Sequence, residues 1–196
     1  MQACMHTHTV ISFWKCCNHP LHQQLDHIIT IVTKLDYGNA TLAGLPAYQY
    51  RRLQSVLNAS ARLIYRRRRF DHVSSLLREL HWLTSAERVA YRLAVTVYRC
   101  LHGLAPSYFT HSVRCVAELD RRRLRSSSDD VIIPTTRLVT VGDRAFAVAG
   151  SRLWNSLPPD VTSAQTLPVF CNRLKTHLFT NCFPSWLYSH ISPYLI

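Results

Sequence analysis

Residues 47–69 read AYQYRRLQSVLNASARLIYRRRR, and this stretch decides the fold class. Apolar residues recur in it at steps of three and four, namely Tyr50, Leu53, Leu57, Ala61 and Ile64. Because residues with this spacing share one face of an α-helix, they form a single apolar stripe. The pattern predicts an amphipathic helix from Ala47 to Arg69. Its arginines lie mostly off the stripe, and the cationic end suits the negative end of the helix dipole.

Further helical segments lie on both sides of this stretch. Residues 25–43 predict one helix weakened at Gly38, and residues 73–83 predict a short amphipathic helix. Thr84 and Glu87 have the spacing of a capping box, which predicts the start of another helix that ends at Gly103. A short helical turn is expected from Pro106 to Phe109. Five helical segments with short connections predict a mainly α chain, built as a small helix bundle.

The part that follows the bundle fits two structures. Residues 138–148 can form a β-hairpin around Gly142, or Asp143 can cap a short Ala-rich helix. We favour the extended form because the β-branched residues of 131–139 prefer strands. Thr166 and Pro168 then begin a last helix. The bundle is therefore expected to be followed by an irregular or short β-hairpin segment and a C-terminal helix.

These patterns predict five regions along the chain. They are an unmatched, disordered leader (1–24), a helical module (25–112), a basic Ser/Arg linker (113–130), a segment with the C-terminal helix (131–180) and an unmatched tail (181–196).

Positive charge is concentrated in the middle of the chain. The whole sequence of 196 residues has 23 Lys and Arg against 11 Asp and Glu, a net charge of +12. Residues 51–125 alone hold 16 arginines and five acids, a local charge of +11. A solubility effect of the whole protein would not be so local. An anionic partner, most simply a nucleic-acid backbone, is the better explanation.

The cysteines and the apolar runs bear on the compartment. Seven cysteines without paired spacing predict a reduced, intracellular chain, in the nucleus, the cytoplasm or both. The apolar run 10–14 is too short for a secretory signal, and no run reaches the length of a membrane span. The Cys and His residues near both ends lack zinc-finger spacing, so no metal site is expected. No feature points to a small-molecule substrate.

Seven ordered strings resemble one family. They closely resemble the C-terminal region of the reverse transcriptase polyprotein of non-LTR, LINE-type or jockey-like, retrotransposons over residues 25–180. The strings are LDYGNATLAGLP (35–46), LQSVLNASARLI (53–64), LLRELHWL (76–83), YRLAVTVYRCLHGLAPSYF (91–109), RRRLRS (121–126), GDRAFAVAGSRLWNSLP (142–158) and RLKTHLF (173–179). The sequence departs from the family pattern at Gly38, Thr84 and Ser151.

The resemblance implies a thumb-like region that packs along a template–primer duplex, without the polymerase palm. Polymerisation needs palm carboxylates that hold two Mg²⁺ ions about 4 Å apart. The one Asp pair, Asp129 and Asp130, follows three serines and has no aromatic neighbour, so we interpret it as a solvated loop. We expect no catalytic residue, no cofactor and no polymerase activity from the isolated chain.

Arginine clusters are the expected contacts with RNA or an RNA–DNA duplex, since guanidinium groups pair with phosphate oxygens. The candidates are Arg51, Arg52, Arg62, Arg66, Arg67, Arg68, Arg69, Arg121, Arg122, Arg123 and Arg125. Tyr65 and Phe70 flank the densest cluster and could stack on unpaired bases, but we interpret both as core residues, like Trp82 and Trp154.

Two other functions stay open. In the first, the chain is a structural remnant whose exposed apolar helix face binds a palm or another protein. In the second, it is an accessory piece of an active reverse transcriptase. Binding of a plain duplex separates nucleic-acid contact from the first, and complementation of a separate palm tests the second.

Overall fold

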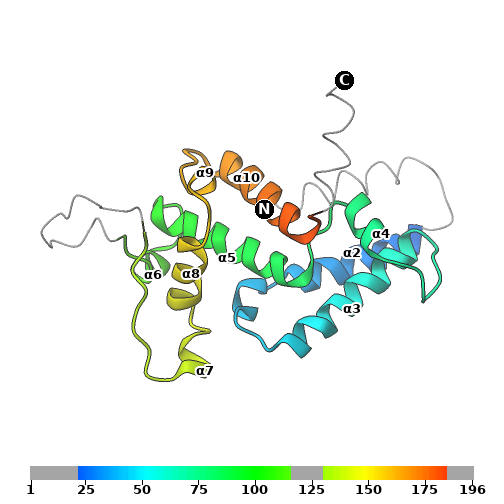
Figure 1. Ribbon diagram of the computed structural model, residues 1–196, viewed down its shortest axis with the longest axis horizontal. Helices are drawn as coiled ribbons and strands as arrows, with labels where there is room; N and C mark the ends of the chain where they lie inside the picture. Colours follow the sequence, from blue (N-terminus) through cyan, green and yellow to red (C-terminus); the bar gives the residue numbers. More distant parts are fainter. Residues whose placement is uncertain (1–21, 116–129, 185–196) are drawn as a thin grey trace, which may run out of the picture. The chain divides into compact units, whose positions relative to one another are not determined.

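The computed structural model describes residues 22–115 and 130–184, and this part of the chain is mainly helical (Figure 1). The prediction of a mainly α fold is confirmed. The helices are α2 (His22–Asp36), the 3-10 helix η2 (Asn39–Leu42), α3 (Ala47–Ile64), α4 (Ser74–Glu79), α5 (Ser85–Leu101), α6 (Ser107–Thr110), α7 (Val139–Gly142), α8 (Phe146–Asn155), α9 (Pro159–Thr162) and α10 (Leu167–Cys182). No helix among these residues is both long and apolar enough to cross a membrane.

The chain divides into two compact units. Among the described residues, the first unit comprises 22–37 and 51–82, and the second comprises 38–50, 83–115 and 130–184. The segments on both sides of the predicted linker 113–130 lie in the second unit. Residues 1–21 and 185–196, most of the predicted leader and tail, lie outside the described residues.

The first unit buries apolar side chains from three helices. Ile28 and Val32 of α2 and Leu57 of α3 are buried, as are Leu76 and Leu77 of α4. Trp82, which follows α4, is only 5% exposed, so its predicted core position is confirmed. The apolar stripe that predicted α3 therefore does face the interior at its centre.

The helix α3 ends five residues earlier than predicted. Its last residue is Ile64, and Arg66 adopts a left-handed conformation with φ 50°. The N–H of Arg67 bonds to the carbonyl of Arg62 (2.9 Å), and that of Arg66 bonds to the carbonyl of Leu63 (3.3 Å). This pair of bonds is a Schellman motif, in which glycine is the usual left-handed residue. Arg66–Arg69 therefore lie in a loop, and the prediction that they continue the helix is wrong.

A glycine also divides the first predicted helix. Instead of one helix over 25–43, α2 ends at Asp36 and η2 begins at Asn39. Gly38 between them has φ 73°, a conformation outside the α-helical range. The amide and the hydroxyl of Thr41 both donate to the Gly38 carbonyl, at 2.9 and 2.7 Å. Gly38 was expected only to weaken one continuous helix, but its left-handed backbone separates α2 from η2.

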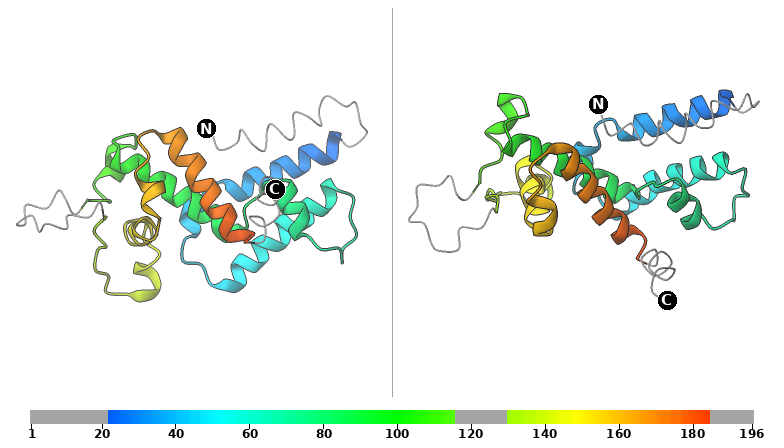
Figure 2. Two further views of the ribbon diagram at one scale, coloured as in Figure 1. Left: turned by 45° about the horizontal axis from the view of Figure 1, so that its top comes forward. Right: turned by 90° about the horizontal axis from the view of Figure 1, so that it is seen from above.

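The second unit is organised around α5, which contacts η2, α8 and α10 (Figures 1 and 2). Its side chains are buried on more than one side, since Val89 and Leu93 lie on one face of the helix and Ala94 and Tyr98 on another. Tyr98 stacks on Phe170 of α10 with ring centroids 4.4 Å apart. The ring of Trp154, from α8, lies 5.6 Å from the Phe170 ring. The predicted core position of Trp154 is confirmed, since it is 5% exposed.

The favoured hairpin at 138–148 is wrong. These residues form α7 and the start of α8, because Phe146 and Ala149 pack with Leu93 of α5 in one apolar cluster. Tertiary packing thus overrides the strand preference of the valines. Extended pairing is found before residue 138 instead, where Val131 makes an isolated antiparallel bridge with Cys115.

The capping box at the start of α5 is not formed. Thr84 is the N-cap residue and has an extended backbone, but its side chain makes no capping hydrogen bond. One carboxylate oxygen of Glu87, Oε2, is buried without a hydrogen-bond partner among the described residues. Both side chains instead lie beside the thiol of Cys182, at the end of α10. The side chains of Thr84 and Glu87, which were predicted to cap α5, therefore lie instead in the contact between α5 and α10.

Candidate nucleic-acid interface

The candidate arginines of α3 differ in their surroundings. Arg51 and Arg52 are exposed on α3. Arg62 is partly buried, and its Nε and Nη2 atoms donate to the main-chain carbonyl of Asp71 at 3.4 and 3.3 Å. Arg51 and Arg52 are therefore available to an anionic ligand, whereas two of the Arg62 nitrogens are engaged with the main chain of Asp71.

Arg66–Arg69 form the densest group of exposed charge in the described residues, in a loop that we call the arginine loop (residues 66–71). The last four residues of this loop form a turn, in which the Asp71 amide donates to the Arg68 carbonyl at 3.1 Å. The Asp71 carboxylate accepts a hydrogen bond of 3.0 Å from the Arg68 amide. The one acidic side chain of the loop is thus engaged with the backbone.

The two aromatic residues that flank the cluster have different positions. Phe70 is 92% exposed, so its predicted core position is wrong. Tyr65 is partly buried, and burial, with a smaller effect of the Glu79 carboxylate, raises the pKa of its hydroxyl. Hydrophobicity alone indicated burial for Phe70, but residue 70 falls at the tip of the Arg68–Asp71 turn.

The second predicted cluster, Arg121, Arg122, Arg123 and Arg125, lies outside the described residues. The residues on both sides of it are close together. Val131 pairs with Cys115, and the Ile132 amide donates to the Arg114 carbonyl at 2.9 Å. The side-chain amide of Asn155 also makes two 2.9 Å bonds to the main chain of Val131. Residues 115 and 131, which are close to the two ends of the second cluster's segment, are therefore paired within the second unit.

Sequence reasoning missed a third group of basic residues, in the second unit. Arg88, Arg92 and Arg99 of α5 are partly buried. They lie at positions i, i+4 and i+11, a spacing that places them on one stripe. Burial, and then the charge of Arg88, lowers the pKa of Lys175 on α10. The helical spacing was the available signal, but the arginines of residues 66–69 and 121–125 were more conspicuous.

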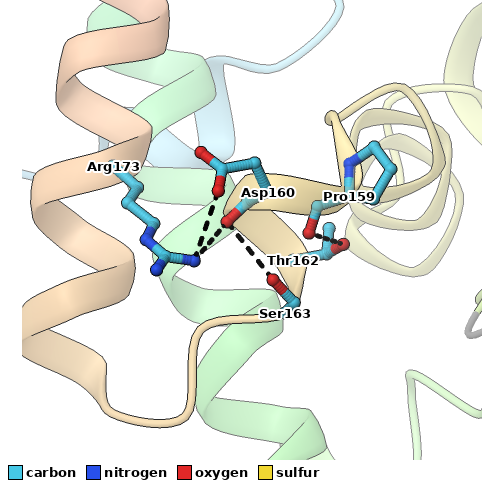
Figure 3. Close-up of polar contacts among 5 residues, drawn as sticks. All are labelled: Pro159, Asp160, Thr162, Ser163 and Arg173. Carbon is cyan, nitrogen blue, oxygen red and sulfur yellow. Dashed lines mark hydrogen bonds and ion pairs between the residues drawn. The ribbon is translucent and has the colours of Figure 1, made fainter.

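Other arginines of the second unit are paired with acids. Arg152 contacts Asp143 at 3.0 Å. Arg173 of α10 reaches α9, where its Nη1 donates to the Asp160 carbonyl at 2.6 Å and lies 3.6 Å from the Asp160 carboxylate (Figure 3). The hydroxyl of Ser163 donates to the same carbonyl at 3.4 Å. These contacts connect α9 to α10. Because the pairs are largely exposed, each adds little to stability.

No three His, Cys, Asp or Glu side chains are grouped so that they could hold a metal ion within residues 22–115 and 130–184. Asp130 of the Asp pair is exposed, and Asp129 lies outside these ranges. The Cys and His residues near the N-terminus lie outside them too, with the exception of His22.

No protein-family model, curated protein or solved structure matches the chain. The resemblance to the retrotransposon polyprotein therefore stays a prediction from the sequence.

Proposed function

We propose that the chain binds the phosphate backbone of RNA or an RNA–DNA duplex, as a non-catalytic fragment of a non-LTR retrotransposon reverse transcriptase. The observation that supports this most is the arginine loop, where four consecutive arginines are exposed and the nearby Asp71 is engaged with the backbone. The described part of the first unit holds nine Lys and Arg against four Asp and Glu. This excess of positive charge favours a polyanion.

The physical basis is phosphate pairing. An arginine stays charged at physiological pH, and its planar group donates two parallel hydrogen bonds to phosphate oxygens. Contacts of this kind release counterions and do not read the base sequence. Arg51 and Arg52, exposed on α3, add further positive charge to the first unit. We therefore expect binding that is independent of sequence and strongly dependent on salt.

The test is a salt titration of the full chain with a labelled RNA–DNA hybrid. If about four phosphates are neutralised, log K falls against log salt with a slope of roughly −3 to −4. Replacing Arg66–Arg69 with Ala is expected to flatten this slope. A control of equal charge replaces Arg137, Arg144, Arg152 and Arg173, all exposed in the second unit. No association at low ionic strength contradicts the function, and equal effects of both variants contradict the site.

A second candidate function rests on exposed apolar residues of α3. Val56 and Leu63 are 39% and 56% exposed and lie seven residues apart, so they share one side of the helix. This side suits a protein partner, such as the palm of a reverse transcriptase that the chain assists. This function is supported if the chain binds a palm with an affinity that does not depend on salt, and if Leu63→Asp abolishes that binding. Salt-dependent binding to a plain duplex favours the first function, contact with nucleic acid.

The arginines of residues 66–69 also suggest where in the cell the chain is found. A cluster of arginines is typical of nuclear-import signals, so we propose that residues 60–75 direct the chain to the nucleus. A fluorescent reporter fused to these residues is expected to accumulate there. A reporter that stays in the cytoplasm contradicts this proposal.

A further inference from the structure

Phe70 is the most exposed large apolar residue in the described part of the chain. Its side chain is 92% exposed, whereas Leu76 and Leu77 nearby are buried. It follows four exposed arginines directly. A phenylalanine ring in water forgoes the free energy that burial would contribute, and its place directly beside the arginines is what suggests a ligand.

The backbone around Phe70 is held in place from both sides. Arg69 and Phe70 are the two central residues of the Arg68–Asp71 turn, which is closed by the 3.1 Å backbone bond and by the 3.0 Å bond from the Arg68 amide to the Asp71 carboxylate. The Arg62 side chain holds the Asp71 carbonyl. Five residues before Asp71, the Schellman motif fixes the conformation of Arg66. The ring is thus presented at the tip of a braced turn.

An exposed ring beside guanidinium groups suits one chemistry in particular. Nucleic-acid bases stack on aromatic side chains, while arginines pair with the adjacent phosphates. In a duplex both faces of each base are already stacked on neighbouring bases. A ring therefore gains most at an unpaired nucleotide, such as one in a single-stranded overhang.

We propose that Phe70 stacks on an unpaired base, so that the arginine loop prefers single-stranded RNA or DNA next to a duplex over the duplex alone. This inference rests on the proposed function, since it assumes that the arginines contact phosphates. It adds a ligand class that duplex binding does not require. Base identity has little effect, because every base offers a flat face.

The test compares two hairpins with one stem, each closed by a linker without bases and either blunt or with a five-nucleotide overhang, by fluorescence anisotropy of the full chain. Stacking predicts that the overhang tightens binding roughly tenfold. Phe70→Ala and Phe70→Leu are expected to abolish the difference, and Phe70→Tyr to retain it. The leucine variant separates ring stacking from simple apolar contact. An overhang of abasic nucleotides is expected to bind like the blunt hairpin.

The matched control is Tyr108→Ala, which removes an aromatic side chain that is 70% exposed in the second unit. It is expected to leave the preference unchanged. Equal binding of blunt and overhang hairpins by the wild type, with the salt slope intact, overturns this proposal and leaves the proposed function standing. Failure to bind either hairpin contradicts both. Equal binding combined with self-association that depends on Phe70 assigns the ring to a protein contact instead.

Discussion

The hydroxyl of Tyr98 donates a hydrogen bond of 3.1 Å to the main-chain carbonyl of Ala164, and both residues are buried. The bond joins α5 to the segment between α9 and α10, 66 residues further along the chain. It therefore satisfies a buried acceptor that belongs to no helix.

We expect Tyr98→Phe to lower the free energy of unfolding by about 1–2 kcal/mol, because the Ala164 carbonyl then stays buried without its donor. The ring contacts with Phe170 are preserved in this variant. Urea denaturation measures the change. Tyr108→Phe, at a largely exposed position, is the control and should have no effect. An equal effect of both variants contradicts the role of this bond.

Gly150 of α8 lies where its helix passes close to α5. A Cβ atom at this position would lie 2.8 Å from Cγ2 of Val97, which is fully buried. Gly150→Ala gains about 1 kcal/mol of helix propensity. Crowding against a stiff β-branched side chain costs about 1–3 kcal/mol. We therefore expect a net loss of about 1 kcal/mol of stability.

The control for Gly150 is a double-mutant cycle. In a Val97→Ala background the blocking methyl group is absent, so Gly150→Ala is expected to be neutral or stabilising there. Thermal or urea unfolding of the four proteins measures the coupling. The same loss of stability in both backgrounds contradicts the proposed clash.

Arg66 and His81 occupy equivalent positions after α3 and α4. Both are left-handed, with φ of 50° and 53°. Both lie in Schellman motifs, since the Trp82 amide bonds to the Leu77 carbonyl at 2.9 Å just as that of Arg67 bonds to Arg62. The left-handed conformation costs a non-glycine residue about 1–2 kcal/mol. Each substitution to Gly is therefore expected to stabilise the chain, by about 1 kcal/mol at most, because glycine also loses more entropy on folding.

These two variants separate conformation from charge. Arg66→Gly is expected to weaken binding to an RNA–DNA hybrid, whereas His81→Gly leaves it unchanged. Urea denaturation and fluorescence anisotropy of the same samples measure both properties. If Arg66→Gly destabilises the chain, the Schellman motif is not what ends α3.

The thiol of Cys182 makes the stability of the folded chain depend on pH. Burial, reinforced by the charge of Glu87, raises the pKa of its thiol from 9.0 to about 11, although contacts with Thr84 oppose the shift. The folded state thus holds this proton more tightly than the unfolded state. The resulting stabilisation is complete below pH 9 and is lost as the pH rises from 9 to about 11.

Alkylation of Cys182, followed by peptide mass spectrometry, tests this pKa. Because the thiolate is the reactive form, we expect slow alkylation of the folded chain at pH 8 compared with the chain in urea. Glu87→Gln removes the negative charge and should increase the rate at pH 9. An unchanged rate in this variant contradicts the effect of Glu87.

The sequence predicted best where packing and pattern agree. The stripe of α3 and the start of α10 at Leu167, after the N-cap Thr166, follow the expected pattern, as does the end of α5 before Gly103. These features depend on periodicity and on residues with special backbone preferences. Both are local properties, which a sequence shows directly.

The failures have tertiary causes. Arginine has good helix propensity, so nothing in residues 65–69 signalled the end of α3. The β-branched residues of 131–139 favoured a hairpin over 138–148, but contacts of Phe146 with the cluster around Leu93 favour a helix. The exposure of Phe70 depends on a turn closed by Asp71, and hydrophobicity gives no sign of it. The spacing of Arg88, Arg92 and Arg99 in the sequence indicates one stripe on α5, but it does not show how far these side chains are buried.

The pairing of Cys115 with Val131, secured by Asn155, has a consequence for how such a chain can vary. The closing contacts are made by Cys115, Val131 and Asn155 themselves, so doubling the number of residues between the paired ends adds only about 0.6 kcal/mol of loop-closure entropy.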